Sequence, residues 1–298
     1  MIWVLRPRAE DNNIRVIQAA FNTPLFFVIM KELLKRFLPP LILDGLRKLR
    51  GDATGCIELS GWPDSGDNYN NNDIAQLVAA KTAYRISHTP KELTLSELQS
   101  IAAVAAAAAG TEERPLRVID IGGGCGIHFF QTINALPELA LDWRIVELPG
   151  MAELSPPHPM LSYYTDIASA LADSPPALLH TSCALGFIRE SDGLWKKIFN
   201  SRAEYILLSR LAVTTAEKDI FALHRHWLSS NGPGSFLPPG FKDRRISYPV
   251  KIFSESALEK RMKAAYKIIW KSDDRTAELL LPGRAIAGRS WFLRRREQ

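Results

Sequence analysis

The residues best suited to chemistry lie in one short stretch, VIDIGGGCGIHFF at 118–130. Asp120 lies near the end of an apolar run, and His128 opens the next one. Between them stand four glycines: Gly122, Gly123, Gly124 and Gly126. Because ordering a glycine costs the most conformational entropy, four together indicate a backbone that bends sharply or admits a ligand. A tight turn between a strand and a helix also presents free N–H groups to such a ligand.

The spacing of the glycines argues against two common nucleotide-binding loops. A dinucleotide loop needs Gly-x-Gly-x-x-Gly, but its third position is Ile127 when counted from Gly122 and Phe129 when counted from Gly124. A P-loop needs Gly-Lys followed by Ser or Thr, and none follows here. A nicotinamide-dependent oxidoreductase is therefore the weaker of the enzyme hypotheses.

The stretch resembles motif I of the class I S-adenosylmethionine-dependent methyltransferases, an acid followed two positions later by Gly-x-Gly-x-Gly. Asp120 and the glycines match this pattern. The resemblance implies a Rossmann-like fold with S-adenosylmethionine as cofactor. It also implies that Gly122, Gly123, Gly124 and Gly126 bring backbone next to the methionine part of the cofactor. Asp120 would order the loop and receive the cofactor ammonium, directly or through water.

Two more acids follow the next predicted strands. Glu147 ends WRIVE, about 20 residues after the glycines, where the family places an acid that binds both ribose hydroxyls. Asp166 follows the third strand and corresponds to the acid that accepts from the adenine amino group. Structural roles stay open for both: Glu147 could be a surface carboxylate at a strand end, and Asp166 could cap a helix.

A narrower likeness is to a bacterial family of methyltransferases associated with surface-polysaccharide gene clusters. Its loop reads GGG-x-G-x-H followed by aromatic residues, as residues 122–130 do. The likeness covers roughly residues 55–275 and is loose outside the loop. Its other matching residues are Gly61, Trp62, Tyr69, Ile74, Trp143, Leu148, Pro149, Arg210, Ser247, Tyr248, Pro249, Ile252 and Phe253.

The chain also departs from that family. It has Leu185-Gly186-Phe187 where the family has Leu-Gln-Tyr, and His224 where glutamine is common. If those family residues contact the substrate, this chain has a different substrate or a reduced activity.

The candidate catalytic and substrate residues follow from the needs of methyl transfer. Most of the catalysis can come from alignment, but a hydroxyl acceptor gains from a base, and His128 has a suitable pKa. Arg210, at the end of the fifth strand, could hold an anionic substrate group, and we expect His224 to contact substrate. The alternatives are a structural hydrogen bond for His128 and a salt bridge for Arg210. His180 is expected to be a hydrogen-bonded core residue, and no metal site is expected because the His224-Arg225-His226 run has no third ligand.

The elements that position these residues form a β/α alternation. Strands are predicted at 115–122, 141–149, 161–167, 177–188, 204–213, 266–272 and 290–296. Helices are predicted at 73–86, 95–109, 126–136, 192–201, 215–228 and 256–265, of which the second opens with a capping box from Thr94 to Glu97. The pattern predicts a doubly wound α/β fold with a mostly parallel seven-stranded sheet. No helix separates the last two strands, so the C-terminal strand should be antiparallel.

The predicted organisation is an N-terminal helical extension or cap at 1–93 and a methyltransferase domain at 94–298. Residues 229–249 are rich in Gly and Pro and too long for a simple connection, so we expect a substrate lid there. Its Arg244 and Arg245 could meet an anionic acceptor.

Composition limits the remaining hypotheses. The chain has 298 residues, 46% of them hydrophobic, and three widely spaced cysteines, which favours a cytoplasmic globular protein without a membrane span. Residues 31–50 carry a net charge of +4 on an amphipathic pattern. They form either a helical pair folded onto the body or, with residues 25–30, a contact with the inner membrane surface. No nucleic-acid-binding signature accompanies the charge.

The sequence thus favours a methyltransferase acting on a small molecule or glycan. The alternatives are a catalytically silent binding protein that keeps the fold and the oxidoreductase mentioned above.

Overall fold

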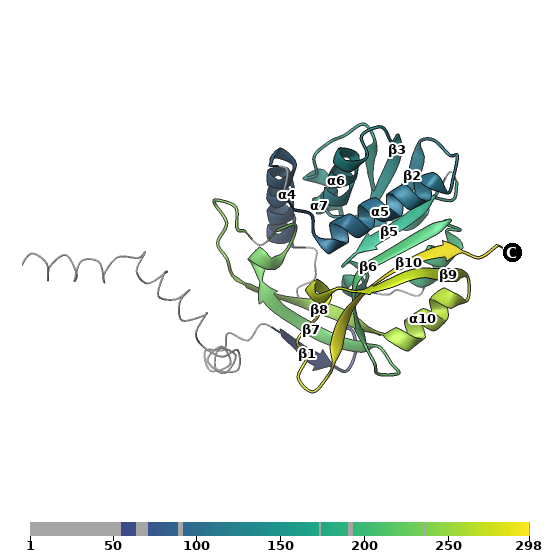
Figure 1. Cartoon of the computed structure of the whole chain (residues 1–298). Helices are drawn as coiled ribbons and strands as arrows, with labels where there is room; N and C mark the ends of the chain where they lie inside the picture. The colour runs from purple at the N-terminus through teal and green to yellow at the C-terminus, as the bar shows by residue number, and fades with distance from the viewer. Residues whose placement is uncertain are drawn as a thin grey trace, which may run out of the picture. The chain divides into compact units, whose positions relative to one another are not determined.

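A computed structural model describes residues 55–63, 71–88, 92–172, 174–189, 193–234 and 236–297, and the structural statements below concern these residues (Figure 1). The basic segment at 31–50, the expected membrane contact at 25–50 and Tyr69 of the family likeness lie outside them. Within the described residues, no helix combines the length and the apolar character that crossing a bilayer requires.

The seven predicted strands are confirmed and lie in one mostly parallel sheet. In spatial order, β4, β3, β2, β5 and β6 are parallel, and β10 joins β6 to β9 with antiparallel pairing on both sides. The chain therefore has the predicted Rossmann-like α/β fold with an antiparallel C-terminal strand. The bounds are β2 Leu116–Ile121, β3 Leu141–Val146, β4 Leu161–Tyr164, β5 Leu178–Ser182, β6 Tyr205–Thr214, β9 Tyr266–Asp273 and β10 Ile286–Arg295.

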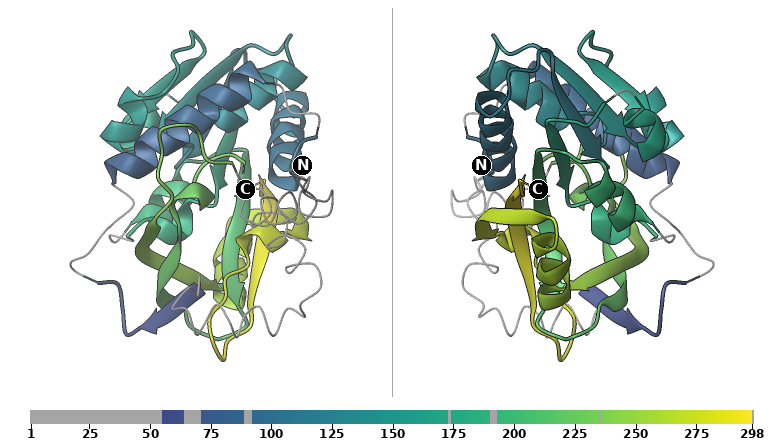
Figure 2. Two further views of the ribbon diagram at one scale, coloured as in Figure 1. Left: turned by 90° about the vertical axis from the view of Figure 1, so that its left-hand side faces the viewer. Right: turned by 90° about the vertical axis from the view of Figure 1, so that its right-hand side faces the viewer.

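Helices cover both faces of the sheet (Figure 2). The capping box predicted for α5 is formed, since the Thr94 hydroxyl accepts from the Glu97 N–H while the Glu97 carboxylate accepts from the Thr94 N–H. The α-helices are α4 Asn72–Ser87, α5 Leu95–Ala109, α6 Ile127–Ala135, α7 Pro149–Glu153, α8 Ile167–Ala170, α9 Leu194–Asn200 and α10 Glu255–Lys263. Short 3₁₀ turns are η1 Leu185–Phe187, η2 Leu228–Ser230 and η3 Arg275–Ala277.

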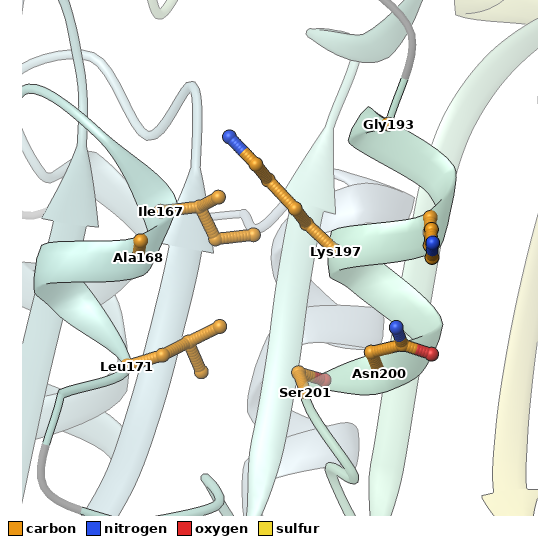
Figure 3. A pocket seen from close by; sticks show the side chains of 8 residues that line it. Ile167, Ala168, Leu171, Gly193, Lys197, Asn200 and Ser201 are labelled. Carbon is orange, nitrogen blue, oxygen red and sulfur yellow. The ribbon is translucent and has the colours of Figure 1, made fainter.

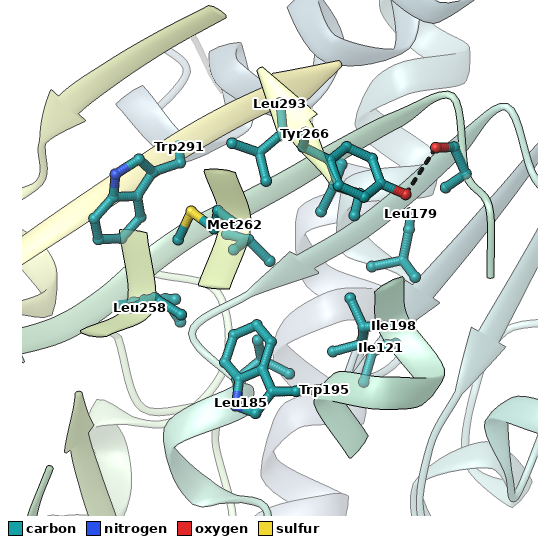
Figure 4. Close-up of a cluster of buried hydrophobic side chains, with 14 of the residues drawn as sticks. Ile121, Leu179, Leu185, Trp195, Ile198, Leu258, Met262, Tyr266, Trp291 and Leu293 are labelled. Atoms are coloured by element: carbon teal, nitrogen blue, oxygen red, sulfur yellow. Dashed lines mark hydrogen bonds between the residues drawn. The ribbon is translucent and has the colours of Figure 1, made fainter. Parts of the chain in front are cut away.

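Alternate residues of the central strands supply two cores. In β2, Val118 packs with the alanine face of α5 and with Phe129 of α6, whereas Ile119 packs on the opposite face with α9 and α10. Figure 4 shows this second core, where the Tyr266 hydroxyl donates to the carbonyl of Ala203. Burial of both faces explains why the strands are nearly continuous apolar runs.

The helix predicted at 215–228 is wrong, because the chain forms strand β7 (Ile220–Trp227) there. The loop predicted to reach residue 249 ends earlier, because β8 (Arg245–Ser254) pairs antiparallel with β7. β1 (Gly55–Leu59) adds to the other side of β7, and β8 joins the main sheet through the end of β6. Three strands thus extend the predicted sheet.

Candidate functional site

The candidate site lies where the strand order of the sheet reverses. From β2 the chain adds β3 and β4 on one side, then crosses to add β5 and β6 on the other. The carboxyl ends of β2 and β5 therefore flank the switch point, which is where open α/β sheets bind ligands. The loops after these strands come together so closely that a Cβ on Gly122 would overlap the Cβ of Ala184.

The glycine loop is held in a conformation that disfavours side chains. Gly122, Gly124 and Gly126 have φ of +70°, +58° and +81°, in the left-handed region that L-residues rarely adopt. Gly123 instead lies against the Asp120 carboxylate, where a Cβ would collide with an oxygen. The loop consequently presents backbone rather than side chains, as the sequence predicts.

Asp120 lies beneath this loop and is fully buried. One carboxylate oxygen is 2.7 Å from His180 Nδ1, and the other accepts from Trp143 Nε1 at 3.3 Å. These contacts fix the Asp120 carboxylate beneath Gly123, and its expected ordering of the loop stays a prediction. Its expected contact with a cofactor ammonium stays a prediction.

Glu147 reaches across from the end of β3 to the glycine loop. Its Oε1 accepts from the Gly124 N–H at 3.1 Å, and its Oε2 accepts from the Leu148 N–H at 2.6 Å. Burial raises the pKa of Glu147 against the opposing effect of these two N–H groups. Each oxygen keeps a further lone pair for a donor from outside the protein.

Asp166 caps α8, the structural alternative considered for it. Its side chain accepts from the backbone N–H and the hydroxyl of Ser169, at 2.9 and 2.5 Å, and these bonds lower its pKa. The carboxylate is exposed after β4, so its adenine contact stays a prediction.

His128 lies in the first turn of α6, buried beside two polar partners. Its Nδ1 is 3.1 Å from the Ser100 hydroxyl oxygen, which is also 2.9 Å from His180 Nε2. Burial lowers the pKa of His128 well below its usual value, and the positive potentials of His180 and Arg210 lower it further. His180 is the hydrogen-bonded core residue that the sequence predicts, whereas the part played by Ser100 was not foreseen.

Arg210 stands at the carboxyl edge of the parallel strands. The residue before it, Ser209, pairs with Ser182, the last residue of β5. Arg210 has a left-handed φ of +57°, and its Nε donates to the Ser182 hydroxyl at 3.0 Å. Within the described residues the guanidinium bonds this hydroxyl rather than a carboxylate, so the salt bridge considered for it is not formed there. A strained backbone at such an edge is typical of functional positions.

His224 lies on β7. Its ring stacks on His226 at 4.5 Å and lies 6.4 Å from Phe187, which follows β5. Burial lowers the pKa of His224 to about 4 and that of His226 to about 3. His224 Nδ1 and His226 Nε2 are buried without a hydrogen-bond partner in the described structure. Over the same residues, no three potential ligands gather for a metal ion.

The buried histidine pair should make stability depend on pH. A folded-state pKa below the unfolded value of about 6.5 means that the unfolded chain binds more protons as the pH falls, so stability is lost from pH 6.5 downward. His226→Phe removes one such ring and should recover about 2 kcal/mol at pH 5 relative to pH 7.5. Urea unfolding at both pH values measures this difference. If the free energy of unfolding depends equally on pH in the variant and the wild type, His226 is protonated as readily in the folded protein as in the unfolded chain.

A third layer covers the glycine loop: helix α4 and the segment 229–244. Val78 of α4 lies between the glycine loop and the segment. It is 3.5 Å from a Cβ built on Gly124 and in close contact with Gly232. The fully buried Lys81 donates to three backbone carbonyls of the segment. These acceptors are Ser229, Asn231 and Gly234, at 2.6, 2.8 and 2.9 Å. The Lys81 side chain therefore anchors the segment to α4, a contact that sequence reasoning missed.

The two arginines expected to meet an anionic acceptor have partners inside the protein. Arg244 donates to Asp73 of α4 at 2.5 Å, and the Arg245 guanidinium lies 5.3 Å from the Trp227 ring. Leu237 and Phe241 pack into the same apolar cluster as Cys125 of the glycine loop. The segment thus covers the loop through apolar contacts.

A groove of about 400 Å³ lies elsewhere, between α8 and α9 (Figure 3). Lys197 extends from α9 toward Ile167, the residue after Asp166. None of the other predicted site residues lines this groove. It is an outer surface of the helices that follow β4 and β5.

Comparison with known proteins gives likenesses of structure only. No protein-family model and no curated protein sequence matches the chain. A solved S-adenosylmethionine-dependent methyltransferase from Clostridium acetobutylicum is 11% identical, with 73% of this chain and 98% of that one covered and a TM-score of 0.42.

Two further solved structures match in the same way. The sugar N-methyltransferase KedS8 from Streptoalloteichus is 11% identical over 81% of this chain and 99% of its own, with a TM-score of 0.45. The methyltransferase CcbJ from Streptomyces caelestis is 12% identical over 76% and 100%, with a TM-score of 0.44. Because these identities and TM-scores are low, the fold is assigned from the strand order and the pairing of the sheet alone.

Proposed function

We propose that this chain binds S-adenosylmethionine at the glycine loop and transfers its methyl group to a small molecule or glycan. The observation that carries this proposal is the loop at the switch point, whose Gly124 N–H is held by the Glu147 carboxylate at 3.1 Å. The motif I resemblance implies a backbone loop next to the amino acid part of the cofactor and a strand-end acid next to its ribose. The glycine loop and Glu147 form this pair.

The residues present fit that cofactor. The left-handed glycines leave backbone exposed where a methionine part would lie, and Glu147 keeps acceptor capacity for the ribose diol. Asp166, at the end of β4, would accept from the adenine amino group. When bound, S-adenosylmethionine supplies a methyl carbon that bonds to the acceptor atom as its bond to sulfur breaks and the electron pair stays on sulfur.

The chain itself supplies alignment and exclusion of water. His128 would take a proton from the acceptor, and Arg210 would hold an anionic group of it. Residues 94–298 would form the catalytic domain, residues 1–93 the cap and the segment 229–244 the lid. His224 and Phe187 would face the acceptor side, and the likeness of the loop to the surface-polysaccharide family favours a glycan. We propose a cytoplasmic location, with contact to the inner membrane surface through residues 25–50.

Substitutions at Glu147 test the cofactor site. Glu147→Ala should weaken binding of S-adenosylhomocysteine by about 1–3 kcal/mol, the usual cost of leaving polar partners unpaired. Glu147→Gln should retain part of this affinity, because one acceptor oxygen remains. Isothermal titration of the three proteins measures the difference.

The control is Glu153→Ala, which removes an exposed carboxylate from α7 and should leave the affinity unchanged. Wild-type affinity in both Glu147 variants would make Glu147 a structural strand-end residue and remove the carrying observation.

A further inference from the structure

Four side chains from four elements form a continuous buried chain of hydrogen bonds, here termed the relay. It runs from Asp120 of β2 to His180 of β5, then to Ser100 of α5 and His128 of α6. The three links measure 2.7, 2.9 and 3.1 Å, and the exposed fractions of the residues lie between 0% and 6%. The relay ends at His128 Nε2, for which the described residues provide no hydrogen-bond partner.

The Ser100 hydroxyl decides where the protons of the relay lie, because it has one proton and three neighbours. Its oxygen is near the Ser96 carbonyl at 2.9 Å as well as the two rings. If the hydroxyl donates to His180 Nε2, His128 must donate to it from Nδ1. If it donates to the Ser96 carbonyl, both rings must donate to it, and His180 then has a proton on each ring nitrogen. His128 Nε2 then has a free lone pair and can act as a base.

The arrangement in which Ser100 donates to His128 contains one more proton than the one in which it donates to His180. If Ser100 donates to His128 Nδ1, then His180 must donate from Nε2 while its Nδ1–H faces the Asp120 carboxylate. His180 is then an imidazolium beside a carboxylate, and His128 is neutral with its proton on Nε2. When His128 Nε2 accepts a proton, the arrangement in which Ser100 donates to His180 therefore changes into the one in which Ser100 donates to His128. The change takes two short proton transfers.

We propose that His128 is the base of the proposed methyl transfer and that Ser100 passes the charge on to the Asp120–His180 pair. The proposal rests on the function above. As the acceptor oxygen bonds to the methyl carbon, its proton goes to His128 Nε2. The Nδ1 proton of His128 moves to Ser100, and the hydroxyl proton of Ser100 moves to His180 Nε2. His180 then carries the positive charge that the cofactor lost.

Electrostatics favours this route over a charged His128. Burial and the nearby positive groups His180 and Arg210 hold the pKa of His128 well below its usual value, so an imidazolium there is costly. On His180 the same charge lies 2.7 Å from the Asp120 carboxylate, which stabilises it. Such a base serves an acceptor that must lose a proton, as a hydroxyl group does.

Nitrogen NMR of the full-length protein labelled with ¹⁵N-histidine tests the relay without an acceptor. At neutral pH, His128 should carry its proton on Nδ1. On acidification, His180 should become doubly protonated while His128 stays neutral and its proton moves to Nε2 in the same transition. A His128 that carries its proton on Nε2 at neutral pH, or that becomes an imidazolium before His180, would overturn the proposal.

Two variants separate the relay from general effects of packing. Ser100→Ala should uncouple the two rings, so that the His128 tautomer no longer follows protonation of His180. Ser209→Ala, an equally buried serine that bonds Gln99 instead of a histidine, should keep the coupling. Coupling that persists in Ser100→Ala would overturn the relay.

Titration of the same wild-type sample with S-adenosylhomocysteine tests the proposed function separately. A coupled relay without binding would contradict the methyltransferase function, whereas binding without coupling would contradict the relay alone.

Discussion

Gly122→Ala should weaken cofactor binding at the candidate site while the rest of the sheet stays folded. The new Cβ would overlap Ala184 at the switch point, and the residue would be held at a left-handed φ of +70°. Strain of this kind costs about 1–3 kcal/mol, so we expect the affinity for S-adenosylhomocysteine to fall by roughly tenfold or more. Isothermal titration gives the affinity, and circular dichroism shows whether the fold is retained.

Two controls separate the overlap from the backbone strain. Gly124→Ala has the same kind of strain, but its Cβ would meet only Val78 at an ordinary 3.5 Å, so its effect should be smaller. The double variant Gly122→Ala/Ala184→Gly removes the overlapping methyl and should recover part of the lost affinity. If Gly122→Ala binds like wild type, the two loops do not form the binding site.

Lys81→Met should release the segment 229–244 from α4. The substitution keeps the length of the side chain but leaves three backbone carbonyls without their donor. Because each unpaired buried acceptor is costly and the segment can relax toward water, we expect the free energy of unfolding to fall by about 2–4 kcal/mol. Hydrogen exchange should become faster in residues 229–234 and in α4, before the central strands change.

Lys218→Met is the matched control, because Lys218 is exposed in the turn between β6 and β7. It should change neither the stability nor the exchange of the segment by more than the usual effect of a surface substitution. Unchanged protection of residues 229–234 in Lys81→Met would mean that the apolar contacts of Leu237 and Phe241 hold the segment without the lysine.

The central sheet could be predicted because its signals are local. Strands such as β2 and β5 are short apolar runs, and the helix after β2 follows a glycine turn. The capping box of α5 needs only residues three positions apart. Local signals also located the glycine loop, as a glycine cluster after one apolar run, and Glu147, as an acid after the next run.

The β7–β8 hairpin was missed because its signals conflict with the alternation around it. Ile220, Ala222 and His226 are buried at a two-residue period, which is a strand signal, but the position after β6 favoured a helix. The Gly and Pro content of residues 229–249 favoured a loop there. Pro249 is tolerated in β8 because this strand pairs with β6 only at Phe253 and Ser254, past the proline.

The relay and the Lys81 anchor depend on partners that the sequence does not bring together. Ser100 stands in an alanine-rich helix 80 residues before His180, and the acceptors of Lys81 lie 148 to 153 residues after it. A lysine or serine within a helical pattern has no local signal of burial. Only the packing of α4 and α5 shows that these side chains face inward.

The most direct test of the proposed function compares the binding of two cofactors at the glycine loop. The full-length chain is titrated by calorimetry with S-adenosylhomocysteine and, separately, with NADH, and the glycine-loop variant Gly122→Ala is titrated alongside. We expect saturable binding of S-adenosylhomocysteine at one site per chain, weakened in Gly122→Ala, and no saturable binding of NADH. Saturable NADH binding, or S-adenosylhomocysteine binding that Gly122→Ala does not affect, would contradict a methyl-donor site at this loop.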